Sequence, residues 1–160
     1  MGDKMKKKAI CIIMAAVLVA AVAAVIVIKN KTVKNDRVRE YSNIEQAVEA
    51  ADFDMDYTDR LAGVPATGYS SNSSTIEITY GDAGFIRKTL GVANNSDSRS
   101  GLTEKNEQTI NNYKVTLRGR DGKYYLATWE YNSFAYTISI SDSQEGATLE
   151  EMTDYINSIR

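Results

Sequence analysis

Residues 9–28 are apolar without interruption, whereas apolar and polar residues alternate along much of the chain that follows them. An α-helix of about 20 residues spans the roughly 30 Å hydrocarbon core of a bilayer. A helix also satisfies its own backbone hydrogen bonds, which lipid cannot do. The pattern therefore predicts an N-terminal transmembrane helix at residues 9–28, with the lipid bilayer as its partner.

A cleaved signal peptide is the alternative interpretation of this apolar run. The apolar region of a signal peptide measures about 7–15 residues and ends at a small-x-small site, which Ala21-Val22-Ala23 matches. Residues 24–28, however, continue the run beyond that site. We therefore favour an uncleaved anchor, in which Cys11 is a small residue facing lipid.

Basic residues flank the apolar run on both sides, four before it and five within residues 29–39. The positive-inside rule counts Lys and Arg near the helix ends, so this count is nearly balanced. The free amino terminus and the three lysines directly before the run favour a cytoplasmic N-terminus. We predict a cytoplasmic tail at residues 1–8, a polar connector at 29–41 and an extracytoplasmic domain at 42–160.

Two short amphipathic helices are predicted, one at each end of that domain. Ser42 and Glu45 have the spacing of a capping box, and apolar residues follow at helical spacing to give a helix at 43–51. Thr148 and Glu151 repeat the box before the last helix. The apolar face of this last helix would consist of Leu149, Met152, Tyr155, Ile156 and Ile159.

The Asp-rich segment after the first helix has two interpretations. Three aspartates at alternate positions resemble the start of a calcium-binding loop. The sixth position of that loop is Tyr57 where Gly is needed, and the twelfth is Gly63 where Glu is needed. Because the aspartates alternate with apolar residues, we favour a strand over residues 53–57.

Two polar stretches are predicted as loops. Residues 61–74 hold the only proline and a Ser/Asn cluster, and residues 91–109 contain almost no large apolar side chain. Between them, alternating residues predict a strand at 76–80, and a second strand at 85–90 is predicted to pair antiparallel with it.

Three more strands are predicted before the last helix, and the first turn decides which side chains are buried. A three-residue loop at 120–122 would place Leu117 opposite Tyr125, whereas a two-residue turn would place Leu117 opposite Leu126. We predict the three-residue loop, because only this register agrees with that of the next hairpin.

In that next hairpin, a two-residue turn at 132–133 places Tyr131 opposite Phe134 and Trp129 opposite Tyr136. A slip of one residue would turn a whole strand inside out. The register therefore predicts that Trp129 belongs to the core rather than to a ligand-stacking site.

Together these elements predict an α+β domain: an antiparallel β-meander with short helices at both ends of the domain covering one face. The opposite face would meet water or a partner, and the strand at 113–118 would lie at a sheet edge open to an added strand. The candidate interaction residues on this polar face are Lys114, Thr116, Arg118, Thr128, Glu130, Thr137 and Ser139.

Composition excludes several chemistries. The chain has no His, and its one Cys lies in the apolar run. Ser-His-Asp and Cys-His catalysis, zinc sites built on His or Cys, and disulfides within the domain are therefore excluded. Residues 41–160 hold 10 basic and 18 acidic residues, a net charge of −8, so we expect no nucleic-acid partner. We also expect no cofactor and no metal.

Residues 113–129 contain the pattern Val-Thr-Leu-x-Gly-x-Asp-Gly-x-Tyr-x-Leu-Ala-Thr-Trp. With the helix start at 45–53 and the aromatic strand and capped helix near the C-terminus, this segment resembles a family of Gram-positive bacterial domains of unknown function. The resemblance covers about residues 43–160 and departs at 58–74 and 91–109. It implies a membrane-anchored domain outside the cell, sometimes in proteins that look like anti-sigma factors or their regulators, and it assigns no catalytic residue.

Three functions are compatible with these features. The first is a non-enzymatic module at the cell envelope that binds a protein, peptide or envelope ligand. The second is a signalling component of the anti-sigma type, whose tail at residues 1–8 is too short to hold a sigma-binding domain. The third is an envelope hydrolase using paired carboxylates, such as Glu77 with Asp82 or Glu104 with Glu107, although no sequence feature brings either pair together. We favour the first.

Overall fold

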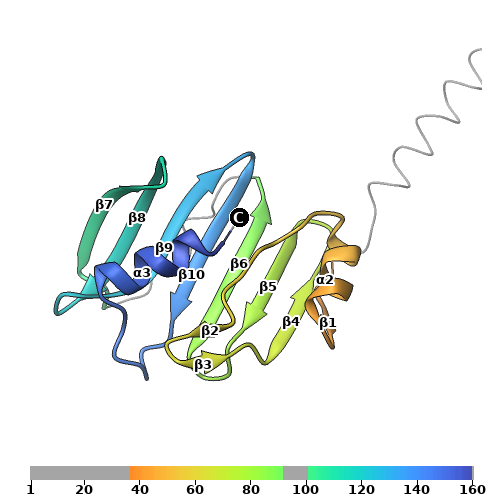
Figure 1. Cartoon of the computed structure of the whole chain (residues 1–160), viewed down its shortest axis with the longest axis horizontal. Helices are drawn as coiled ribbons and strands as arrows, with labels where there is room; N and C mark the ends of the chain where they lie inside the picture. The colour runs from red at the N-terminus through yellow and green to blue at the C-terminus, as the bar shows by residue number, and fades with distance from the viewer. Residues whose placement is uncertain (1–36, 92–100, 160) are drawn as a thin grey trace, which may run out of the picture. The chain divides into compact units, whose positions relative to one another are not determined.

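An eight-stranded antiparallel sheet forms the body of the computed structural model, which describes residues 37–91 and 101–159 (Figure 1). Two short helices accompany the sheet, so the predicted α+β class is confirmed. In spatial order the strands are β1 (Arg39–Tyr41), β4 (Gly68–Ser71), β5 (Thr75–Thr79), β6 (Gly84–Leu90), β10 (Phe134–Ile140), β9 (Lys123–Tyr131), β8 (Tyr113–Arg120) and β7 (Glu104–Ile110).

The sheet consists of two meanders rather than the single one that we predicted. Strands β4, β5 and β6 follow one another, as do β7, β8, β9 and β10, and β10 then pairs antiparallel with β6. The chain therefore passes from β6 to the far edge of the sheet before it returns to the middle. Short turns specify only neighbouring strands, so they carry no signal for the pairing of β6 with β10.

Three segments differ from the predicted loops and connector. In place of the predicted loop at 61–74, β2 (Arg60–Leu61) and β3 (Val64–Pro65) form a small hairpin, and β4 joins the main sheet. Residues 104–109 belong to β7 instead of a loop, and residues 39–41, which we expected in the connector, form β1. All these strands are short or polar, which is why alternation of apolar residues did not reveal them.

The predicted strand at 53–57 is wrong. These residues pair with no strand in the described structure and cross the helix-side face of the sheet between α2 (Ile44–Ala51) and β2 (Figure 1). Met55 is buried and Phe53 is half-buried against the core, whereas Asp52, Asp54 and Asp56, which alternate with them, are exposed. The segment is therefore amphipathic because it lies on the sheet, and not because it belongs to it.

Both helices cover one face of the sheet. On α2 the side chain of Asn43, rather than that of Ser42, caps the helix by accepting a hydrogen bond from the Gln46 backbone N–H at 3.1 Å, so the first predicted capping box is shifted by one residue. The second box is confirmed, because Thr148 and Glu151 cap α3 (Leu149–Asn157) reciprocally.

The turn between β8 and β9 corrects the predicted loop. Asp121 and Gly122 form a two-residue turn with φ of 55° and 72°, the positive values of a type I′ hairpin. A bulge then leaves Tyr125 without a partner on β8, so that Leu117 lies opposite Ala127. The predicted three-residue loop, and with it the pairing of Leu117 with Tyr125, is wrong.

The predicted buried face of these strands is nevertheless correct. The bulge shifts the register by one residue in the direction opposite to that of an extra loop residue, and a shift of one residue in either direction buries the same face. The β9–β10 pairs Tyr131–Phe134 and Trp129–Tyr136 are confirmed. Trp129 is 3% exposed and stacks on Tyr136, with ring centroids 5.1 Å apart and planes 5° apart. Trp129 is therefore a core residue.

No helix among residues 37–91 and 101–159 is long and apolar enough to cross a membrane. The predicted membrane helix at 9–28 lies outside the described residues, and so do residues 92–100 of the predicted loop.

Ionisation of the buried Tyr80 phenol makes the stability of the fold depend on pH. Its side chain is fully buried and its hydroxyl donates to the Thr58 carbonyl oxygen at 2.7 Å, and burial raises the pKa of this phenol. A buried acid whose pKa is raised binds its proton more tightly in the folded state than in the unfolded state. The protonated Tyr80 phenol therefore contributes its full share of the free energy of unfolding below the unfolded pKa of 10, and this share is lost as the pH rises above 10.

We therefore expect the free energy of unfolding to fall above pH 10, and Tyr80→Phe to flatten that fall by up to about 1.4 kcal/mol per pH unit. At neutral pH the same substitution should cost about 1 kcal/mol, the worth of the lost hydrogen bond. Urea denaturation from pH 8 to pH 11 measures both effects. Tyr131→Phe, at a half-exposed tyrosine, is the control, and equal alkaline slopes in the two variants would contradict the assignment.

Candidate functional site

The sheet face opposite the helices carries the predicted interaction residues. Thr116 on β8 lies opposite Thr128 on β9, which in turn lies opposite Thr137 on β10. This threonine row, as we name the three residues, crosses the middle of the sheet at right angles to the strands. The sequence thus predicted three residues that the structure brings side by side.

The centre of this polar face is shielded from solvent, in contrast to our expectation. Thr137 is 7% exposed and Ser139 is 1% exposed. Ser139 lies in register between Phe85 on β6 and Leu126 on β9, and these larger side chains flank its small one. Solvent and partners therefore reach the face mainly through the residues of the outer strands.

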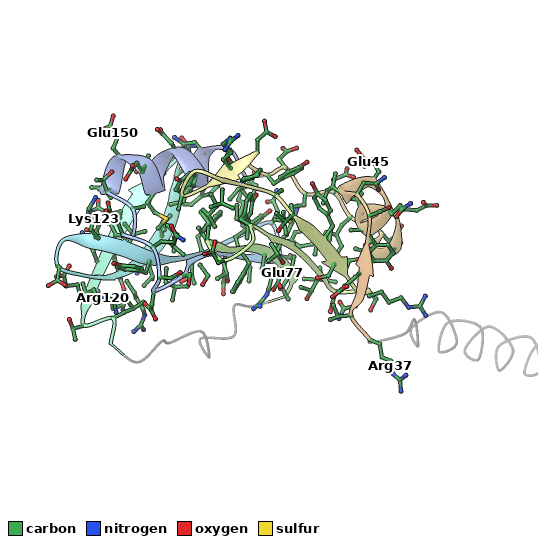
Figure 2. The ribbon with its side chains drawn as sticks, turned by 90° about the horizontal axis from the view of Figure 1, so that it is seen from below. Arg37, Glu45, Glu77, Arg120, Lys123 and Glu150 are labelled. Atoms are coloured by element: carbon green, nitrogen blue, oxygen red, sulfur yellow. The ribbon has the colours of Figure 1, made fainter. Side chains whose placement is uncertain are left out.

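Arg87 and Glu77 extend the threonine row toward β5. Sequence reasoning missed Arg87 and named Glu77 only as a carboxylate for a hydrolase. Arg87 lies opposite Thr137, and Glu77 lies opposite Arg87. The guanidinium pairs with the Glu77 carboxylate at 2.7 Å and lies 4.5 Å from the centroid of the Phe85 ring. Figure 2 shows Glu77 on the side of the sheet away from Glu45 and Glu150 of the helices. Opposite charges at polar positions of the β5–β6 hairpin were the signal that could have found this pair.

The charges at the other end of the face belong to β7 and β8. Glu107 lies opposite Thr116 and contacts Lys105 at 2.9 Å and Lys114 at 3.2 Å. Its hydrogen bonds with Lys105 and then Lys114 hold the pKa of the Glu107 carboxyl below its usual range. Lys114 itself is 79% exposed, so it is available to a partner on this face.

The remaining predicted residues lie beside these groups, but the predicted sheet edge is wrong. Arg118 on β8 is half-buried and Glu130 at the end of β9 is exposed. The strand at 113–118 is β8, which β7 covers. The edge available for strand addition on this side is therefore β7, a polar strand that the sequence pattern did not reveal.

The carboxylates suggested for a hydrolase make separate contacts. Glu77 is paired with Arg87, and Asp82 lies in the turn between β5 and β6. On β7, Glu104 accepts a hydrogen bond from the Gly122 backbone N–H at 3.3 Å, whereas Glu107 binds lysines. Residues three apart on a strand point to opposite faces, so Glu104 and Glu107 do not form a facing pair.

No group of three or more His, Cys, Asp or Glu side chains among the described residues is arranged to hold a metal ion.

Lys88 is a buried cation on the helix-side face of β6. It is 7% exposed, and its Nζ donates to the Asp54 carbonyl oxygen at 2.5 Å and lies 4.6 Å from the centroid of the Phe134 ring. Burial lowers the pKa of this ammonium, while the nearby Asp54 and Asp56 carboxylates oppose that shift. The contacts of Lys88 fasten the crossing segment at 52–58 to the sheet.

An open hollow of about 380 Å³ lies where β7 turns into β8 and β9 ends. Its lining residues are Asn111, Asn112, Tyr113 and Tyr131. Sequence reasoning missed it, because it assigned residues 91–109 to a loop and so gave no partner to the strand that begins at 113.

Comparison of the chain with protein families, with curated proteins and with solved structures finds no match.

Proposed function

We propose that this protein is a non-enzymatic, membrane-anchored module of the bacterial cell envelope, which binds a protein partner through the polar face of its sheet. In this proposal residues 9–28 anchor the chain, residues 1–8 remain in the cytoplasm and the sheet domain lies outside the cell. This placement is what the motif resemblance described for residues 43–160 implies.

The observation that carries the proposal is the one-sided construction of the sheet. Both helices and the crossing segment cover the same face, and the other face carries the threonine row, of which Thr116 and Thr128 are half-buried and Thr137 is buried. Arg87 is held by Glu77 and Phe85, so its position is fixed before any partner binds. Fixed polar groups lose little conformational entropy on binding, which favours a specific interface.

A photo-cross-linking experiment in cells tests this function. A photoreactive residue replacing Thr128, on the polar face, should give a discrete adduct with one protein, whereas the same residue replacing Glu150, on α3, should give none. The charge reversal Arg118→Glu should weaken the Thr128 adduct at least severalfold, because it changes the potential of the face. Equal adducts from both positions, or no effect of the reversal, would reject a specific interface here.

The placement of the domain has a test of its own. Protease added to intact cells or protoplasts should digest residues 42–160 without permeabilisation. Survival of the domain until the membrane is opened would contradict the proposed orientation, independently of any partner.

A further inference from the structure

The hollow at the β7–β8 turn combines an aromatic platform with amide groups. Tyr113 begins β8 and Tyr131 ends β9, and their rings meet with centroids 4.9 Å apart and planes 51° apart. Tyr131 is 44% exposed, although Trp129, two residues earlier on the same face, is 3% exposed. The helix-side layer therefore ends between these two residues and leaves the ring of Tyr131 uncovered.

Apolar side chains follow Tyr131 along the end of the sheet. Phe134 lies opposite Tyr131, and Leu90 lies opposite Phe134 on the next strand. Leu90 is 52% exposed. The Phe134 ring, however, is covered by Phe53, with ring centroids 5.0 Å apart, and by the Lys88 ammonium at 4.6 Å. Tyr131 is therefore the ring of this row on which a ligand can stack.

The amides come from the turn itself. Asn111 and Asn112 have φ of 49° and 65°, a left-handed conformation that Asn tolerates better than most residues. The side-chain nitrogen of Asn111 donates to Asn157 Oδ1 on α3 at 2.6 Å, which fixes its amide beside the hollow. Asn112 is exposed, and its side chain makes no hydrogen bond within the described residues. Each amide can both donate and accept.

These groups match one class of ligand. A pyranose ring presents an apolar C–H face, which stacks on an aromatic ring, and a rim of hydroxyls, each of which donates and accepts a hydrogen bond as an amide does. None of the four lining residues is charged, and the excess of acidic over basic residues in the domain opposes an anionic ligand. The volume of about 380 Å³ falls within the usual range of about 300–1,000 Å³ for ligand sites.

We infer that this hollow is a binding site for a neutral oligosaccharide, with Tyr131 as the stacking platform and Asn112 as a hydrogen-bonding group. The site is separate from the polar face proposed for a protein partner, because Tyr131 lies on the helix side of the sheet. Binding here and binding at the polar face can therefore succeed or fail independently.

Titration of the full-length chain in lipid nanodiscs tests the site, with saturation-transfer NMR as the readout. The probes are two neutral tetrasaccharides, one of N-acetylglucosamine and one of glucose, and the anionic tetragalacturonate. We expect at least one neutral probe to bind and tetragalacturonate not to bind. Tyr131→Ala should weaken binding at least tenfold, Asn112→Ala should weaken it severalfold, and Tyr131→Phe, which keeps the ring, should retain most of the affinity.

Tyr41→Ala, on the edge strand β1 at the other side of the sheet, is the matched control and should leave the affinity unchanged. Circular dichroism of each variant separates loss of the site from loss of the fold. The inference is overturned if neither neutral probe binds at up to about 10 mM, if tetragalacturonate binds as tightly as they do, or if folded Tyr131→Ala binds like the original chain.

Discussion

Replacing Trp129 by Ala is expected to lower the free energy of unfolding by about 3–5 kcal/mol. The indole is 3% exposed and stacked on Tyr136 between β9 and β10. Its removal leaves a cavity in the buried layer beside Tyr136. Urea denaturation followed by circular dichroism measures the loss, because the substitution removes the only Trp as a fluorescence probe.

Tyr131→Ala is the matched control for this loss. It removes an aromatic side chain from the same strand and the same face, but from a position that is 44% exposed. We expect it to cost about 1–2 kcal/mol, because nearly half of its surface is already in contact with water. Equal losses of stability in the two variants would contradict the assignment of Trp129 to the core and of Tyr131 to its margin.

The buried face of β8, β9 and β10 was predictable because it depends only on whether each residue is odd or even along its strand. Three loop residues, or two loop residues and one bulge residue, give the same faces. The sequence therefore placed Trp129 correctly from a loop that does not exist. Gly119 was the signal that could have indicated the bulge, because a glycine within a strand often marks one, but we assigned the register shift to a longer loop instead.

The order of the strands was less accessible. The pairing of β6 with β10 joins residues 84–90 to residues 134–140, and β7, β8 and β9 lie between them along the chain. Turn residues report neighbours along the chain and not partners this distant. For the same reason Lys88 could not be recognised from sequence as a buried cation. Its aromatic neighbours Phe53 and Phe134 lie far from Lys88 along the chain.

Of the two candidate sites, the polar face could be predicted from the sequence and the hollow could not. Alternation was enough to place Thr116, Thr128 and Thr137 on one face, and the hairpin registers then align them. The tyrosine–asparagine hollow depends on β7, whose polar sequence resembles a loop. Polar edge strands avoid unwanted pairing with other chains, so the property that makes β7 useful at an edge also hides it from pattern-based prediction.

Gly84→Ala should lower the free energy of unfolding by about 3 kcal/mol or more, because it disturbs the pairing of β6 with β10, where the two meanders meet. Gly84 begins β6 at φ of 137° and lies opposite Ile140. A Cβ atom built there would overlap the Ser139 carbonyl oxygen. The strained backbone contributes about 1–3 kcal/mol, and the overlap with backbone contributes a similar amount, because no flexible side chain can move aside.

Gly68→Ala is the control, and it tests whether the loss of stability depends on the position of the glycine rather than on replacing any strand glycine. On β4 the added methyl group would lie at an ordinary 3.6 Å from Thr79 Cβ, so we expect a change within about 1 kcal/mol of zero. Denaturation midpoints compare the two variants. Since Thr137 and Arg87 meet across the same β6–β10 joint, Gly84→Ala should also weaken the Thr128 cross-link, whereas Gly68→Ala should leave it intact. Equal stability of the two variants would show that β6 and β10 are not held as closely as this register requires.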